Sequence, residues 1–145
     1  MESIHFFSEQ TKFNLKLKTQ IRHWIRSVIH QYKKRITNLN FIFTSDEYLI
    51  EINQKYLNHN TYTDIVTFDQ STINNRLEAD IYISIDRVQA NAKQLEVPFD
   101  DELHRVLIHG VLHLLGYKDK TLADKEEMRK RENHFLALRL NSTNR

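Results

Sequence analysis

The sequence predicts one α+β domain over residues 1–145, with an α/β-type mixed sheet packed by about five helices. Strand-like segments alternate along the chain with helix-like segments, which favours a small, mostly parallel sheet of about four strands. Two of the strand-like segments lie close enough in sequence to be neighbours, which adds one antiparallel strand. The hydrophobic fraction of 40% and the charged fraction of 28% are ordinary for a globular chain.

Two strand-and-helix pairs are expected in the N-terminal half. The strands are short runs rich in apolar and β-branched residues, and the helices have apolar residues at helical spacing. Ser45 is expected to cap the second helix, because a serine oxygen can accept a hydrogen bond from the first turn. In chain order, the expected elements are the strand Ile4–Phe7, the helix Leu17–Lys34, the strand Asn40–Thr44 and a helix beginning at Asp46.

Two further strands and three helices are expected after a polar loop. Val97 and Pro98 interrupt the helical pattern, because proline lacks the N–H that a helix interior uses. Asp100 or Asp101 is expected to cap the helix that follows. The expected elements are the strands Asp64–Phe68 and Asp80–Ser84, the helix Asp86–Glu96, a helix that contains two histidines, and a final helix at Leu122–Leu140.

The histidine helix is the most informative segment of the chain. His109 and His113 are four residues apart, so their side chains share one face of the helix. Apolar residues cover most of the remaining circumference, which predicts a central, buried helix with the histidines on its main polar stripe. Gly110 would let a neighbouring strand or helix approach closely. Gly116 can take the left-handed conformation that ends a helix and turns the chain back.

A third ligand follows the turn. Asp119 lies ten residues after His109 and completes an expected site for one divalent cation, most consistent with Zn²⁺, with a position left for water or substrate. The chain has no cysteine, so the ligands must be nitrogen and oxygen atoms. The spacing is that of the metzincin peptidases, but Gly110 stands where those enzymes have their glutamate base. The sequence therefore indicates a metal site and disfavours a conventional zinc peptidase.

Positive charge is concentrated in the N-terminal third. Residues 1–45 carry eight Lys/Arg against two acids, and such a cluster can neutralise phosphates. Arg22, Arg26 and Lys33, on the outward face of the first helix, are the candidate cations; a solvated helix face is the alternative. No apolar run approaches the roughly 20 residues of a membrane helix, so no membrane partner is expected. Together with the absence of cysteine and of a signal-peptide pattern, this favours a cytoplasmic protein.

Three motifs together resemble the YbeY family. They are His109-Gly-x-Leu-His113-Leu-x-Gly116-Tyr117, Thr63–Phe68 and Asp80–Ser84. The resemblance implies a bacterial, single-strand-specific, metal-dependent endoribonuclease that acts on the 3′ end of 16S rRNA and in ribosome quality control. It implies rRNA and the small ribosomal subunit with its proteins as partners. It also implies a small mixed sheet packed with helices, with the metal at the histidine helix.

The chain departs from the family pattern at two site positions. The family motif ends in a histidine where this chain has Asp119, so the third ligand would change from nitrogen to oxygen. Leu57 stands where the family has an arginine after the tyrosine equivalent to Tyr56. His59, two residues further on, is the candidate catalytic residue. It would supply a cation or proton donor near the position of that arginine.

The expected chemistry is metal-assisted cleavage of a phosphodiester. Bound Zn²⁺ can lower the pKa of its water from about 15.7 toward roughly 7 and can polarise a phosphoryl oxygen. Either the resulting hydroxide or the 2′-OH of the RNA would attack phosphorus, with Arg22, Arg26 and Lys33 holding the strand. Two alternatives stay open. One is a non-catalytic ribosome-assembly or RNA-binding factor with a structural metal, and the other is a zincin-like peptidase or other hydrolase.

Overall fold

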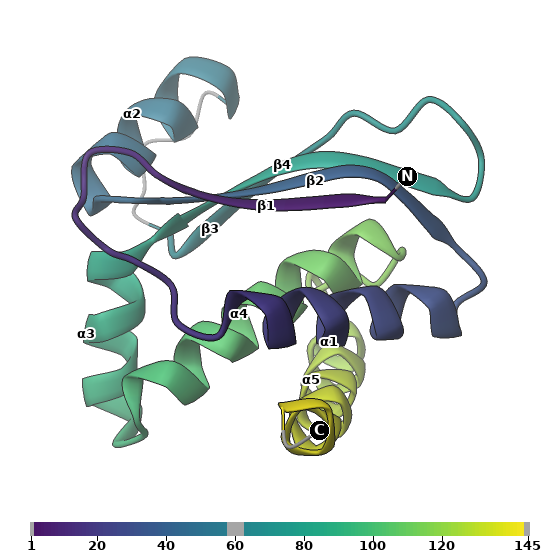
Figure 1. The fold of residues 1–145 in the computed structure, drawn as a ribbon. Helices are drawn as coiled ribbons and strands as arrows, with labels where there is room; N and C mark the ends of the chain where they lie inside the picture. Colours follow the sequence, from purple (N-terminus) through teal and green to yellow (C-terminus); the bar gives the residue numbers. More distant parts are fainter. Residues whose placement is uncertain (1, 58–62, 144–145) are drawn as a thin grey trace.

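A mixed sheet forms the centre of the fold (Figure 1). The computed structural model describes residues 2–57 and 63–143, and within them the sheet has four strands in the order β1-β2-β4-β3. β1, β2 and β4 are parallel, and β3 pairs antiparallel with β4. The strands are β1 (Ser3–Ser8), β2 (Arg35–Thr44), β3 (Ile65–Asp69) and β4 (Arg76–Ser84). The predicted fold class is confirmed, including the single antiparallel strand.

The helices cover the two faces of the sheet unequally. α1, α4 and α5 lie on one face, α2 lies on the other, and α3 stands at one end (Figure 1). None of the helices in the described ranges is long and apolar enough to cross a membrane. The helices are α1 (Lys18–Gln31), α2 (Asp46–Leu57), α3 (Ile85–Leu95), α4 (Phe99–Leu114) and α5 (Leu122–Thr143).

α4 is the central helix, and it carries the two histidines. Leu107, Ile108 and Val111 are fully buried, as expected for a helix that is apolar around most of its circumference. A Cβ atom at Gly110 would lie 2.9 Å from Ile65 Cδ1 of β3 and 3.3 Å from a methyl carbon of Ile81 in β4. The predicted close approach at Gly110 is therefore confirmed, and it brings α4 directly under the edge of the sheet.

Replacing Gly110 with valine is expected to destabilise the fold. Its Cβ and two methyl groups would overlap the Ile65 and Ile81 side chains, and overpacking of this kind costs about 1–3 kcal/mol of unfolding free energy. At this chain length each kcal/mol lowers the melting temperature by roughly 2–4 °C. Thermal unfolding followed by circular dichroism measures the effect. Ala90→Val, on the exposed face of α3, is the control, and an unchanged melting temperature for Gly110→Val would refute the close-packing argument.

The first helix ends earlier than predicted. α1 stops at Gln31, and the N–H of Lys33 donates to the His30 carbonyl at 3.0 Å. Lys33 has a left-handed φ of 60° and lies in the turn that leads to β2. The expectation that Lys33 lies on the outward helix face is therefore wrong, because the helix has already ended.

Of the two predicted helix caps, one is confirmed. The Tyr48 N–H donates to Ser45 Oγ at 3.2 Å, so Ser45 caps α2. The predicted cap at Asp100 or Asp101 is wrong, because Pro98 occupies the N-cap position of α4 with φ −61° and ψ 147°. Both aspartates lie instead in the first turn, where the positive end of the helix dipole stabilises their negative charges.

Candidate metal centre

Three side chains converge at the C-terminal end of α4. The Nε2 atoms of His109 and His113 are 3.0 Å apart, and Asp119 Oδ2 lies 3.3 Å from each of them. In the described part of the chain, these three residues form the one group of His, Cys, Asp or Glu side chains whose ligand atoms all lie close enough to share a metal ion. The three residues predicted from their spacing are thus brought together.

The turn after α4 positions Asp119. The Gly116 N–H donates to the His113 carbonyl and the Tyr117 N–H to the Leu112 carbonyl, both at 3.0 Å. This pair of bonds is the Schellman arrangement that ends many helices, and it requires a residue in the left-handed region. Gly116 takes that role with φ 105°, so the predicted helix stop is confirmed and the chain returns Asp119 toward the histidines.

Tyr117 holds this turn against two other helices. Its hydroxyl lies 3.0 Å from the hydroxyl of Tyr32, just after α1, and the Arg131 guanidinium of α5 lies 5.6 Å from the centre of its ring. Burial and the hydrogen bond to Tyr117 raise the pKa of Tyr32 to about 12. The Tyr32 hydroxyl therefore stays protonated at neutral pH, and its hydrogen bond with Tyr117 helps to hold the segment that carries Asp119.

The hydrogen bonds of the two imidazoles direct their lone pairs toward one point. His113 Nδ1 lies 3.0 Å from the Tyr117 carbonyl, which can only accept, so Nδ1 carries the proton. His109 Nδ1 lies 2.6 Å from Glu132 Oε2, and it likewise donates to that carboxylate. In the neutral imidazoles the two Nε2 atoms are then unprotonated acceptors. Two nitrogen lone pairs and a carboxylate oxygen therefore face one another.

This arrangement fits a small divalent cation. Ligands about 2.0–2.2 Å from a tetrahedral ion lie about 3.3–3.6 Å from one another. The observed separations of 3.0 and 3.3 Å are close to that spacing, and a cation would replace acceptor–acceptor repulsion with coordination. The residues fit an ion that accepts two nitrogens and one oxygen and leaves a further position open.

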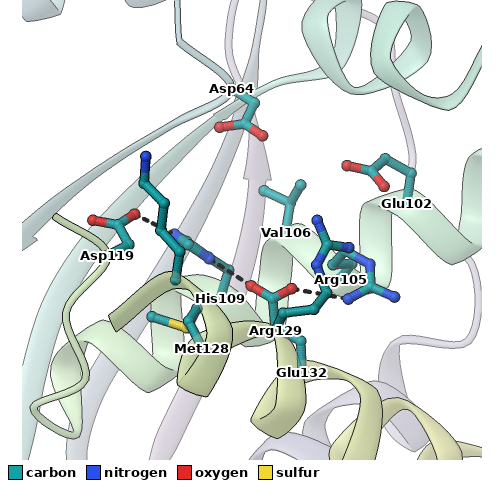
Figure 2. Close-up of a pocket in the computed structure, with 10 residues that line it drawn as sticks. Asp64, Glu102, Arg105, Val106, His109, Asp119, Met128, Arg129 and Glu132 are labelled. Atoms are coloured by element: carbon teal, nitrogen blue, oxygen red, sulfur yellow. Dashed lines mark hydrogen bonds and ion pairs between the residues drawn. The ribbon is translucent and has the colours of Figure 1, made fainter. Parts of the chain in front are cut away.

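Glu132 of α5 accepts a hydrogen bond from His109 Nδ1, the ring nitrogen that does not face the other ligands. The residue is 96% buried, and Arg105 Nη1 donates to its second oxygen at 2.9 Å (Figure 2). Burial alone would raise the pKa of Glu132, but hydrogen bonds from His109 and Arg105 outweigh it and lower the pKa. Burial alone would lower the pKa of His109, but the bond to Glu132 outweighs it and raises the pKa. Glu132 is thus an ionised carboxylate that fixes the orientation of His109.

Replacing Glu132 with glutamine is expected to weaken metal binding by about 10- to 100-fold, the usual cost of losing a carboxylate behind a ligating histidine. The amide lacks the negative charge that makes the His109 ring a better donor. Competition with a chromophoric chelator measures the dissociation constant. Glu126→Gln removes the same charge from an exposed position of α5 and should bind metal as the wild type does. Equal affinities for the two variants would show that Glu132 is not needed for metal binding.

A pocket of about 400 Å³ opens beside His109 and Asp119. Asp64 and Glu102 also line it, and Figure 2 shows both carboxylates on the side of the pocket away from Glu132. Burial raises the pKa of each of them. A carboxyl group with a raised pKa beside a metal site can exchange protons with a substrate nearer to neutral pH. The pocket thus combines a site that can hold a cation with groups suited to acid–base chemistry.

Comparisons with known proteins identify the family. The model of the family described as Endoribonuclease YbeY matches residues 3–139. The chain belongs to the YbeY family. An Endoribonuclease YbeY from Cytophaga hutchinsonii is 50% identical over 138 residues, covering 95% of this chain and 96% of the relative. One from Christiangramia forsetii is 50% identical over 135 residues, covering 93% of each. The resemblance inferred from the histidine and strand motifs is confirmed.

A solved structure shares the fold. The solution structure of a Thermotoga maritima protein, TM1509, aligns with a TM-score of 0.65 over 98% of this chain and 95% of its own. At 23% sequence identity this similarity shows the fold alone. It agrees with the α+β architecture that the YbeY family match implies.

The remaining predicted site residues lie elsewhere. Arg22 Nε donates to the Ile4 carbonyl of β1 at 2.8 Å, and Arg26 lies 3.8 Å from a Glu2 oxygen. Neither of them, nor Lys33, lines the pocket beside the metal ligands. His59, the predicted catalytic residue, lies outside the residues that the structure describes.

Sequence reasoning missed Glu132 and Asp64. Glu132 comes 23 residues after His109 on a separate helix, and Asp64 precedes β3, so no local spacing connects them to the histidines. One signal for Glu132 was available. It falls on the same stripe of α5 as the buried Met128 and Phe135, and a carboxylate at a core-facing position needs a partner.

Proposed function

We propose that this YbeY-family chain is a single-strand-specific endoribonuclease that uses one Zn²⁺ ion held by His109, His113 and Asp119. Family membership supports the reaction, since the curated relatives are named endoribonucleases. The observation that carries the metal assignment is the convergence of two imidazole Nε2 atoms and a carboxylate oxygen, with both Nδ1 atoms already bonded. Nitrogen and oxygen ligands with an open position are characteristic of catalytic zinc sites.

The chain's own residues would prepare the site for phosphodiester cleavage. Glu132 and the Tyr117 carbonyl hold the two imidazoles in the tautomer that ligates, so little reorganisation is needed. When bound, the cation would supply Lewis-acid activation of the phosphodiester and a more acidic water. Asp64, across the pocket, is placed to accept or return a proton. His59 is kept as a candidate proton donor on the sequence argument alone.

The position of Gly110 favours RNA over peptide as the substrate. In the zinc peptidases the residue after the first histidine is the glutamate base. In this chain that position faces Ile65 and Ile81 in the core, and no side chain fits there without displacing them. A base for peptide hydrolysis is thus absent at the position where that chemistry needs it.

The biological setting follows from the family and is part of the proposal. We propose that residues 1–145 act as one catalytic domain in the cytoplasm, on the 3′ end of 16S rRNA and in ribosome quality control, in contact with the small subunit and its proteins. The basic residues Arg22, Arg26 and Lys33 are kept as candidate contacts to more distant parts of the RNA. Their separation from the pocket is compatible with an extended strand.

One experiment separates the candidate functions. The purified protein is incubated with single-stranded RNA, with duplex RNA and with unfolded casein, each with and without a chelator. Cleavage of single-stranded RNA that is lost with the chelator and restored by Zn²⁺ is the expected result. Cleavage of casein would indicate a peptidase. If neither substrate is cut, but the chelator lowers the melting temperature, the metal is structural and the protein acts by binding.

A further inference from the structure

One face of α5 forms a wall of the metal pocket. Lys125, Met128, Arg129 and Glu132 all line the pocket that His109 and Asp119 border. They are spaced i, i+3, i+4 and i+7, so they form a single stripe along the helix. In Figure 2, Arg129 and Glu132 extend from α5 into the same space as His109. The helix that supports His109 through Glu132 therefore also presents two cations to the pocket.

Lys125 and Arg129 differ from Arg105, the third cation of the pocket. The Arg105 guanidinium is occupied, since it donates to Glu132 and to Asn133 Oδ1, each at 2.9 Å. Lys125 and Arg129 are exposed, and neither side chain makes a hydrogen bond or ion pair with the residues described in the ranges 2–57 and 63–143. Two charges without a hydrogen-bond or ion-pair partner among the described residues thus stand beside the ligand cluster. The Arg129 charge acts on Glu102 without forming an ion pair with it, and there it opposes the burial that raises the Glu102 pKa.

The remaining charges of the pocket show where an anion would lie. Asp64 and Glu102 line the wall away from α5, and their carboxylates would repel a phosphate. The α5 wall and the cation site are the favourable positions for negative charge. An RNA strand that occupies both positions would have one phosphodiester next to the metal ligands and a neighbouring phosphate next to α5.

We propose that Lys125 and Arg129 bind the RNA backbone phosphates that adjoin the scissile phosphodiester. The proposal rests on the function proposed above and assigns it a substrate-binding surface on α5, distinct from the basic residues of α1. Four residues of helix separate the two cations along the axis by about 6 Å, so both can contact one extended strand. Contacts to phosphate carry no base information, so this surface would position RNA of any sequence.

The test compares matched charge removals on α5. The zinc-loaded variants Lys125→Gln, Arg129→Gln and the double variant are assayed for cleavage of a labelled single-stranded RNA over a range of salt concentrations. Lys130→Gln is the control, because Lys130 is exposed on the same helix but does not line the pocket. Melting temperature and zinc content are measured for each variant and should equal those of the wild type.

Each pocket variant is expected to lower kcat/KM by about three- to tenfold at low salt, mainly through KM. The slope of log(kcat/KM) against log[salt] should become less steep by about 0.7 for each lost phosphate contact. Lys130→Gln should keep the wild-type slope. If the pocket variants keep it too, or if Lys130→Gln changes it equally, the surface on α5 is refuted while the nuclease function stands. Failure of the zinc-loaded wild type to cut RNA would instead refute the proposed function.

Discussion

Replacing His113 with alanine is expected to remove the bound cation and reduce RNA cleavage by about 10³-fold or more. Metal activation contributes several kcal/mol to the transition state, and each 1.36 kcal/mol changes the rate tenfold. The variant also loses one of the two converging nitrogen lone pairs, so the remaining pair of ligands would bind metal weakly. Elemental analysis of the purified protein and initial rates on single-stranded RNA measure both effects.

His23→Ala is the matched control for this prediction. His23 is an exposed histidine of α1 and does not line the metal pocket. The two variants should have similar melting temperatures in the presence of a chelator, which shows that both chains fold. Stoichiometric metal in His113→Ala, or cleavage at the wild-type rate, would show that the cation or the reaction depends on other residues.

Asp119→Ala is expected to have the next largest effect. Losing a ligand should weaken Zn²⁺ binding by at least the roughly 100-fold that losing a supporting carboxylate can cost. Asp119→His should retain metal, because a histidine restores a nitrogen donor at the same place in the turn. Affinity is measured by chelator competition, and cleavage should fall with metal occupancy across the two variants.

The structure of the zinc complex tests the role of Asp119 directly. An Asp119 oxygen should lie about 2.0–2.2 Å from the ion, with His109 and His113 as nitrogen ligands. If Asp119→Ala binds Zn²⁺ as tightly as the wild type, another group completes the site. Asp64 is the first candidate, because it lines the same pocket.

The fold was predictable where the apolar pattern is regular. All the expected strands and helices are present in the described residues, but β2 begins at Arg35 rather than at Asn40. The buried Ile36 and Leu39 both face the core although they are three residues apart, because an irregularity in the pairing with β4 falls between Ile36 and Asn38. Such a bulge breaks the two-residue alternation by which a strand is recognised, so the first half of β2 could not be predicted.

The site was predictable where it is local. His109, His113 and Asp119 lie within eleven residues, and helical geometry with a glycine stop is enough to bring them together. Glu132, Asp64 and the α5 cations come from separate elements, and their positions depend on how α5 and β3 pack on α4. The basic residues of α1 were recognised in the sequence, but the structure does not place them at the pocket. Their clustering was visible in the sequence, but Arg22 and Arg26 contact Ile4 and Glu2 of the same chain.

Titration of the metal-free protein with Zn²⁺, with RNA cleavage followed at each addition, tests whether one bound ion makes the protein a nuclease. We expect the metal-free protein to be inactive. Its rate on single-stranded RNA should rise in proportion to added Zn²⁺ and level off at one ion per chain. Full cleavage by the metal-free protein, or one bound ion per chain with no cleavage at any point, would contradict this expectation.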